Sequence, residues 1–138
     1  METIRTGKLI VIEGTDGSGK TTQFKKLVLR MSASGKTVTT FDFPQYGRPS
    51  AYFVEQYLRG GYGGEKKSNV LFDMASIDSV GPYAASLFYA MDRFDARAAI
   101  AAALARGETL ISNRYVTSNM GHQGAKIARK NARQKFFK

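Results

Sequence analysis

Short apolar runs along the 138 residues alternate with longer stretches of helical periodicity. The runs KLIVIE at 8–13, TVTTFDF at 37–43 and TLIS at 109–112 are apolar, β-branched or aromatic, which predicts three strands. We expect the first strand to be buried on both faces of a parallel sheet, because its apolar residues are continuous rather than alternating with polar ones.

Helices are predicted between these strands. The first begins after the glycine-rich loop at 14–19 and ends at Gly35, a residue suited to the left-handed conformation that closes helices. Its apolar positions recur at helical spacing, at Phe24, Leu27, Val28 and Met31. A second helix is expected over 49–59, a mobile loop over 60–81, and one long helix over 82–106 that stops at Gly107.

The order strand, loop, helix, strand, helix, strand indicates an open parallel α/β sheet in a single domain, 1–138. In such folds, ligands bind beyond the carboxyl ends of the strands. No apolar run is long enough for a signal peptide or a membrane span, so we expect a soluble, cytoplasmic protein. The absence of cysteine excludes disulfides, thiolate metal sites and a cysteine nucleophile.

The formal net charge is +10, of which residues 126–138 carry +6 without a single acidic residue, leaving +4 for the rest of the chain. Phosphorylated small molecules suit this balance as partners. A nucleic acid bound by the basic segment is a weaker alternative.

Residues 14–21 match the pattern G-x-x-x-x-G-K-[ST], which wraps backbone amides around nucleotide phosphates. A strand before the loop and a helix after it provide the required context. The backbone N–H groups of 17–21 are expected to face the β-phosphate of ATP, with Lys20 bridging the β and γ oxygens and Thr21 binding Mg²⁺. The predicted ATP-binding residues are Gly14, Gly17, Ser18, Gly19, Lys20, Thr21 and Thr22.

Four blocks in order resemble the thymidylate kinase family: TDGSGKTTQ at 15–23, FPQYG at 43–47, LFYAMDR at 87–93 and NRYVTSNMGHQGAK at 113–126. The resemblance implies the three-layer parallel sheet of P-loop nucleoside monophosphate kinases. It also implies transfer of the γ-phosphoryl group of Mg-ATP to thymidine monophosphate (dTMP), giving dTDP, by a homodimeric enzyme.

The resemblance assigns an acceptor site as well. Tyr89 and Arg93 are four residues apart, so on a helix they share one face and could meet one ligand, the tyrosine by stacking on thymine. Arg114 matches the arginine that clamps the acceptor phosphate, and its planar guanidinium suits that task. The dTMP-binding residues so implied are Asp16, Phe43, Tyr46, Tyr89, Arg93, Arg114, Ser118, Asn119, His122 and Gln123. Taken separately, Ser118 and Asn119 are also common turn formers.

Asp16 is unexpected in a loop that binds polyphosphate. The resemblance turns its carboxylate away from the triphosphate, towards the acceptor's 3′-hydroxyl and the neighbouring arginines, and makes Asp16, Lys20 and Arg114 the catalytic set. An Asx turn that stabilises the loop is the alternative.

Two departures from the family pattern concern the reaction. Asn113 stands where the family usually carries an aspartate that helps to hold Mg²⁺. The loop also lacks an arginine at Gly17 or Ser18, and members of that kind supply it from a lid further along the chain. Because the sequence ends before such a lid, we expect the N-terminal part of an enzyme, weakly stable or self-associating and slow in turnover. Another P-loop kinase, a non-enzymatic nucleotide binder and an inert remnant remain as alternatives.

Overall fold

The computed structural model describes residues 6–61 and 80–138, so most of the predicted loop at 60–81 lies outside the described residues. These residues form two compact units. The first unit combines Met1–Phe43 with Arg93–Ser118, and the second combines Pro44–Asp92 with Asn119–Lys138.

A parallel three-stranded sheet forms the centre of the first unit, which confirms the three predicted strands. The strands are β1 (Lys8–Ile12), β2 (Val38–Asp42) and β3 (Thr109–Asn113), in the order β1-β3-β2. The last residues of the three strands, Ile12, Asn113 and Asp42, are in register across the sheet. The segments that follow the strands therefore start at one edge, where α/β folds bind their ligands.

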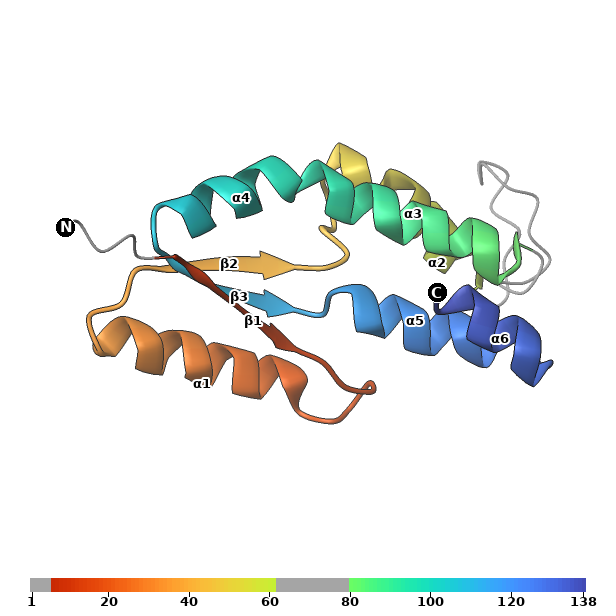
Figure 1. Ribbon diagram of the computed structural model, residues 1–138, viewed down its shortest axis with the longest axis horizontal. Helices are drawn as coiled ribbons and strands as arrows, with labels where there is room; N and C mark the ends of the chain where they lie inside the picture. Colours follow the sequence, from red (N-terminus) through yellow and green to blue (C-terminus); the bar gives the residue numbers. More distant parts are fainter. Residues whose placement is uncertain (1–5, 62–79) are drawn as a thin grey trace. The chain divides into compact units, whose positions relative to one another are not determined.

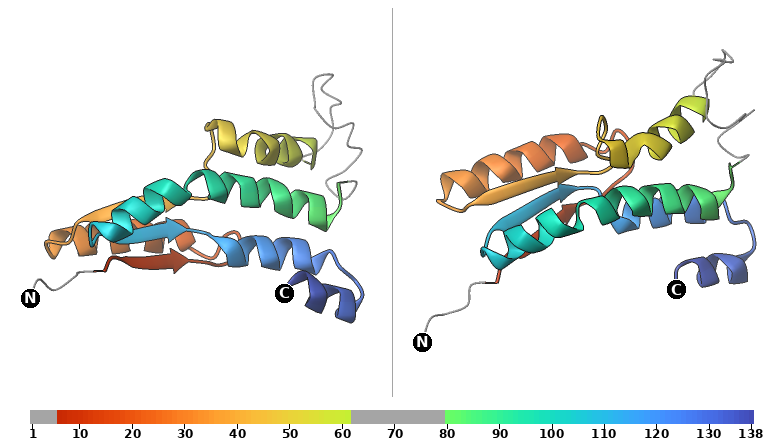
Figure 2. Two further views of the ribbon diagram at one scale, coloured as in Figure 1. Left: turned by 45° about the horizontal axis from the view of Figure 1, so that its top comes forward. Right: turned by 90° about the horizontal axis from the view of Figure 1, so that it is seen from above.

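Strand β3 is the only fully buried strand of the described sheet, because it lies between the other two and is covered on both faces. Helix α1 (Lys20–Ala33) and helix α4 (Arg97–Ala105) pack on opposite faces of the sheet (Figure 1, Figure 2). The expectation that 8–13 is buried on both faces is wrong. Strand β1 lies at the edge, pairs only with β3 among the described strands, and leaves Leu9 39% exposed.

The core of the first unit lies between α4 and the sheet. Successive side chains of a strand point to opposite faces, so Leu110 can join this core while Ile111 faces the other layer, and both are fully buried. The buried cluster consists of Phe43, Ala96, Ile100, Ala103 and Leu110, with Phe41, Leu104 and Tyr115 packed against it.

Helix α1 ends as its sequence predicts. Gly35 has φ of +77°, and its N–H donates to the Ser32 carbonyl, while the Lys36 N–H reaches back to the Met31 carbonyl. This pair of bonds is the Schellman motif, which satisfies carbonyls that the helix leaves open. The chain is thereby turned directly into β2.

The single long helix predicted over 82–106 is two helices, α3 (Pro82–Asp95) and α4, which meet at Ala96. Next to this junction, the Arg97 guanidinium donates to the Phe94 carbonyl at 2.9 Å and lies over the Phe94 ring at 3.7 Å. The side chain thus satisfies a carbonyl that an unbroken helix would have bonded internally. No glycine or proline marks the junction, so the sequence carries no conventional signal for it.

The second unit is mainly helical. The helix predicted over 49–59 is confirmed as a short 3₁₀ turn, η1 (Pro49–Ala51), followed by α2 (Tyr52–Gly61). Most of α5 (Val116–Ala125) and the whole of α6 (Lys130–Phe136) also belong to it. The Tyr57 hydroxyl of α2 accepts hydrogen bonds from Gln123 at 3.3 Å and Lys126 at 3.0 Å, which ties α2 to the end of α5.

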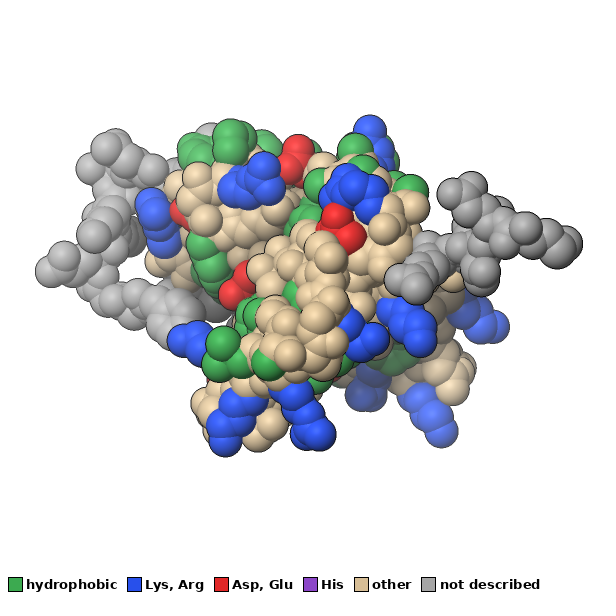
Figure 3. Space-filling model, turned by 90° about the vertical axis from the view of Figure 1, so that its left-hand side faces the viewer, with side chains coloured by type: hydrophobic (Ala, Val, Ile, Leu, Met, Phe, Trp, Pro, Cys, Tyr) green, Lys and Arg blue, Asp and Glu red, His purple; other side chains and the backbone are tan. Residues whose placement is uncertain are grey.

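In the described ranges, no helix is long and apolar enough to cross a membrane. The positive balance of the sequence is visible on the face drawn in Figure 3, where Lys and Arg side chains (blue) predominate over Asp and Glu (red). Anionic ligands therefore meet a favourable field.

Candidate active site

The glycine-rich loop leaves β1 and forms the start of α1. Gly17 and Gly19 have φ of +78° and +84°, values that side chains rarely adopt. Gly19 is the N-cap of α1 and makes no side-chain capping bond. The N–H groups of the first helical turn are therefore left for a ligand, which is the usual anion site at a helix N-terminus.

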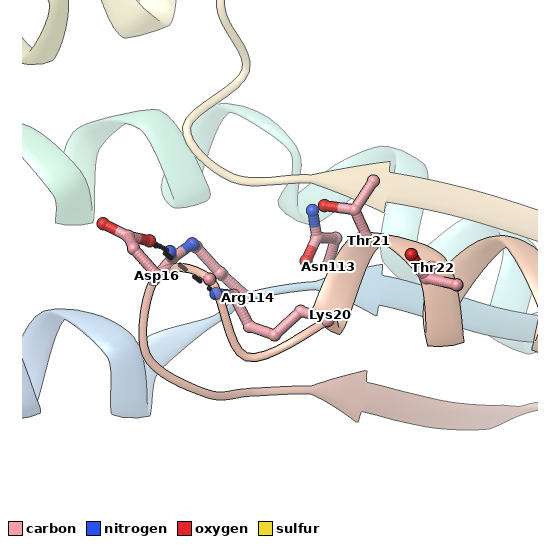
Figure 4. Close-up of a pocket in the computed structure, with 8 residues that line it drawn as sticks. Asp16, Lys20, Thr21, Thr22, Asn113 and Arg114 are labelled. Carbon is pink, nitrogen blue, oxygen red and sulfur yellow. Dashed lines mark hydrogen bonds and ion pairs between the residues drawn. The ribbon is translucent and has the colours of Figure 1, made fainter.

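A pocket of about 360 Å³ lies over this loop, at the carboxyl edge of the sheet. Its lining brings together residues of the loop, the first turn of α1 and the end of β3 (Figure 4). The lining residues are Asp16, Gly17, Gly19, Lys20, Thr21, Thr22, Asn113 and Arg114. The structure thus brings most of the predicted ATP-binding residues and the predicted catalytic set to one hollow.

Asp16 forms ion pairs with both cations of this pocket. Its carboxylate accepts a hydrogen bond from the Arg114 guanidinium and lies 3.7 Å from the Lys20 ammonium (Figure 4). Lys20 also donates to the Thr15 carbonyl at 2.6 Å. The Asp16 carboxylate therefore contacts the cations of the pocket rather than closing an Asx turn, and Arg114 is held next to the loop that is predicted to bind ATP.

Glu13 accepts hydrogen bonds from the segment that follows Arg114. Its Oε1 accepts from the Tyr115 N–H at 2.9 Å, the Thr117 hydroxyl at 2.6 Å and the Ser118 N–H at 3.2 Å, and its Oε2 accepts from the Ser118 hydroxyl. Burial raises the pKa of the Glu13 carboxyl, but hydrogen bonds from Ser118, Thr117 and Tyr115 outweigh burial and lower the pKa overall. Glu13 is therefore an ionised cap for the start of α5.

Asn113 and Asp42 end neighbouring strands and contact each other. The Asn113 amide nitrogen donates to Asp42 Oδ1 at 3.0 Å, while Asn113 Oδ1 is buried and has no hydrogen-bond partner within the described ranges. Asn113 also lines the pocket, together with Thr21.

In the second unit, the segment carrying Tyr46 is fixed by a buried carboxylate. Asp92 is 1% exposed and accepts from the Gln45 N–H at 2.9 Å, the Gln45 side-chain amide at 3.2 Å and the Ser50 hydroxyl at 2.8 Å. The following Tyr46 is 63% exposed. The buried network thus holds a segment whose aromatic side chain points outward.

Two further predicted residues of this unit are buried on α5. Asn119 and Gln123 are 9% and 2% exposed, and their side-chain oxygens have no partner among the residues described. They lie one turn apart, so both occupy one face of the helix. The interpretation of Ser118 and Asn119 as turn formers is wrong, because both lie inside α5.

The remaining predicted acceptor residues are spread over both units. Phe43 is 4% exposed in the core of the first unit, where its ring lies 5.5 Å from that of Tyr115, so its side chain is a packing residue. Arg93 belongs to the same unit and is half-buried. In the second unit, the Tyr89 ring lies edge-on to Tyr57 at 6.3 Å, and His122 is exposed.

Three carboxylates of these arrangements were not predicted as site residues from the sequence: Glu13, Asp42 and Asp92. Glu13 directly follows β1, and Asp42 is the last residue of β2. Polar site residues of α/β folds lie at such strand ends, so their position is a usable signal. Asp92 lies within a helical pattern and offers no such signal.

Comparisons with known proteins agree on one family. A model of the family described as thymidylate kinase matches residues 12–135. The thymidylate kinase of Mycobacterium tuberculosis is 36% identical over 121 residues, covering 86% of this chain and 50% of that protein. The human thymidylate kinase is 31% identical over 122 residues, covering 88% and 50%.

A solved structure of thymidylate kinase from Candida albicans superposes with a TM-score of 0.66 at 26% identity. The superposed part covers 93% of this chain and 48% of the Candida albicans chain. The chain therefore spans about half the length of the relatives it matches.

Proposed function

The chain belongs to the thymidylate kinase family, and we propose that it binds Mg-ATP over the glycine-rich loop and transfers the γ-phosphoryl group to dTMP, giving dTDP. The observation that carries this proposal is the pocket in which the open N-terminus of α1, Lys20 and Arg114 meet. One part of such a pocket suits a polyphosphate and the other a second phosphate, as a kinase acting on a monophosphate requires.

The donor phosphates are proposed to lie on the N–H groups at the start of α1, where the helix dipole also favours negative charge. Lys20 would exchange its bond to the Thr15 carbonyl for the β and γ oxygens of ATP. This exchange is favourable because a phosphate oxygen carries more charge than a carbonyl oxygen.

Mg²⁺ fits the residues at the same end of the pocket. The ion prefers oxygen ligands and keeps several waters, and the pocket wall includes Thr21 and Asn113, whose side chains carry oxygen atoms. Asp42, bonded to the Asn113 amide nitrogen, brings a carboxylate close by. No group of three or more His, Asp or Glu able to hold a metal occurs among the described residues, so we propose that Mg²⁺ arrives with ATP. When bound, it neutralises charge on the β and γ oxygens.

For the acceptor, we propose that Arg114 binds the phosphate of dTMP and that Asp16 faces the sugar. On the strength of the sequence motifs, Ser118 is proposed to lie at the acceptor site. The proposed dTMP contacts from the same motifs are Tyr46, Tyr89, Arg93, Asn119, His122 and Gln123.

In the reaction, an oxygen of the dTMP phosphate attacks the γ-phosphorus while the bond to the β–γ bridging oxygen breaks and ADP leaves. The protein contributes position and charge rather than a covalent intermediate. Lys20 and Arg114 supply positive charge on two sides of the moving phosphoryl group, where negative charge develops. Through its ion pairs with both cations, Asp16 would hold them in place until the substrates replace it.

Calorimetric titration of the chain with Mg-ATP, dTMP and thymidine tests the proposal. Because Arg114 would bind the phosphate, dTMP should bind more tightly than thymidine, and Arg114→Ala should weaken dTMP by about 10- to 100-fold without affecting thymidine. Arg59→Ala is the matched control, since Arg59 is an exposed arginine paired with Glu55 in α2.

Formation of labelled dTDP from γ-labelled ATP and dTMP measures the transfer itself. Equal affinity for dTMP and thymidine, or dTMP binding that survives Arg114→Ala, would overturn the assignment. Tighter binding of thymidine would point instead to a nucleoside kinase.

We also propose that the chain forms a homodimer through α3 and acts in the cytoplasm. In α3, Leu87 and Met91 lie one turn apart and are 64% and 52% exposed. Exposed apolar side chains at helical spacing suit a contact with a second copy.

A further inference from the structure

Arg114 has a strained backbone. Its φ of +65° makes it the only residue other than glycine with positive φ in the described part of the chain. A long side chain is unfavourable in this conformation, and such outliers persist only where surrounding bonds enforce them.

Three hydrogen bonds enforce the conformation. The Arg114 N–H donates to the Ile12 carbonyl at 2.9 Å, and the Arg114 carbonyl accepts from the Ser112 hydroxyl at 2.7 Å. The next N–H, that of Tyr115, donates to Glu13 Oε1 at 2.9 Å. Two of these three bonds reach Ile12 and Glu13, at the end of β1 and just before the glycine-rich loop, so this segment helps to set the backbone of Arg114.

The Arg114 guanidinium is also held by residues linked to the glycine-rich loop and to Glu13. Arg114 Nη1 donates to the Ser118 hydroxyl oxygen at 3.3 Å, and that hydroxyl donates its own proton to Glu13 Oε2. Arg114 Nη2 donates to Asp16. A chain of hydrogen bonds thus runs from Glu13 through Ser118 and Arg114 to Asp16 and returns to the loop from which it started.

The Ser118 hydroxyl has one proton. While Glu13 is ionised and accepts this proton, the oxygen turns its lone pairs towards the guanidinium, which carries only donors. Without an acceptor at residue 13, the hydroxyl proton and the guanidinium protons would compete for the same space. The charge on Glu13 therefore determines whether Ser118 can support Arg114.

From these contacts we propose that Glu13 is a positioning residue, which orients the Arg114 guanidinium towards the acceptor phosphate both through the Tyr115 backbone and through the Ser118 hydroxyl. Ser118 then acts on the acceptor through Arg114 rather than by direct contact. This inference rests on the proposed function for the identity of the acceptor, but the orientation of Arg114 can be measured without any ligand.

A purely structural role for Glu13, as the cap of α5, makes a different prediction. Glu13→Gln keeps a side-chain oxygen for the N–H groups of Tyr115 and Ser118, so it preserves the cap. It places an NH₂ group where the Ser118 hydroxyl needs an acceptor, so it breaks the link to Arg114. Ser118→Ala breaks the same link and leaves the cap intact. Thr117→Val is the matched control, because it removes another bond to Glu13 without touching the link.

The experiment measures order at the Arg114 side-chain Nε–H by ¹⁵N relaxation in the ligand-free chain, with Arg59 as internal reference. Calorimetric affinities for dTMP and thymidine are measured on the same proteins. We expect Glu13→Gln and Ser118→Ala each to lower the order of Arg114 and to weaken dTMP about tenfold, with thymidine unchanged. The double variant should be no weaker than either single one, since both break one chain of bonds.

The outcomes distinguish a positioning role of Glu13 from a purely structural one. If Arg114 stays ordered in both variants, or if Thr117→Val has the same effect, the positioning role is overturned. If Arg114 loses order but the unaltered chain does not prefer dTMP to thymidine, the positioning stands and the proposed acceptor falls. If the two single losses add in the double variant, Ser118 does not transmit the effect of Glu13.

Discussion

The left-handed backbone of Arg114 leads to a stability prediction whose sign is unusual. Replacing Arg114 by alanine or by glycine removes the guanidinium equally, so the two variants differ only in backbone preference. At φ of +65°, a residue with a Cβ is strained by about 1–2 kcal/mol. Glycine avoids this strain, although its greater freedom in the unfolded chain costs about 0.5–1 kcal/mol.

The balance of these two effects favours glycine. We expect Arg114→Gly to exceed Arg114→Ala in free energy of unfolding by about 0.5–1 kcal/mol. The exposed Lys25 in the interior of α1 provides the opposite case, because there Lys25→Ala should exceed Lys25→Gly by about 1 kcal/mol. The order of the two substitutions thus reverses between the two sites.

Equilibrium unfolding in urea, followed by far-ultraviolet circular dichroism and tyrosine fluorescence, measures these differences from the transition midpoints at constant slope. Coincident transitions by the two probes establish that one free energy describes each variant. If Arg114→Ala proved as stable as Arg114→Gly, or more stable, the strain at Arg114 would not exist. The surrounding hydrogen bonds would then not be holding Arg114 in an unfavourable conformation.

A Cβ at Gly7 would lie 2.6 Å from a backbone carbonyl oxygen, so Gly7→Ala should lower the free energy of unfolding by about 1–3 kcal/mol. At Gly121, in α5, a Cβ would meet no atom of the described residues within 4 Å, so Gly121→Ala should raise the free energy of unfolding by about 1 kcal/mol. Equal effects of the two substitutions would show that packing at Gly7 does not matter. The pKa of Glu13 is lowered from 4.5 in the folded chain, so ionised Glu13 contributes fully to the free energy of unfolding above pH 4.5, and this contribution is lost as the pH falls through the folded pKa. The difference in free energy of unfolding between the unaltered chain and Glu13→Gln should therefore shrink when unfolding is measured at increasingly acidic pH. A difference independent of pH would contradict this. If α3 joins two copies, Leu87→Glu should shift the chain from dimer to monomer in sedimentation, and Leu29→Glu, at a 70% exposed site on α1, should not; a monomeric parent chain would exclude the dimer.

Local signals explain what the sequence could predict. The glycine-rich loop needs positive φ at Gly17 and Gly19, and α1 closes with a glycine suited to that conformation, so these features follow from residues within a few positions of one another. The strands were recognisable from apolar runs for the same reason. The status of β1 as an exposed edge strand was not recognisable, because it depends on which strand lies next to it rather than on its own residues.

Helix α5 shows the opposite situation. Its sequence, VTSNMGHQGA, contains two glycines and several residues with low helix propensity, so a helix there is not predicted from local preference. Its start is capped by Glu13, more than a hundred positions earlier. A cap supplied from so far along the chain leaves no trace in the helix's own sequence, and only the fold brings it into place.

The contact between Asp42 and Asn113 follows from the register of β2 and β3 in the sheet. Residues 42 and 113 are partners at the ends of β2 and β3, so a carboxylate absent from one strand can be present on its neighbour at nearly the same height along the sheet. Asn113 uses its amide nitrogen on Asp42 and leaves its oxygen unpartnered in the pocket wall. An asparagine that could donate or accept is thereby fixed as an acceptor. Asn113 therefore lies beside a carboxylate of the neighbouring strand, at the edge of the sheet where the pocket lies.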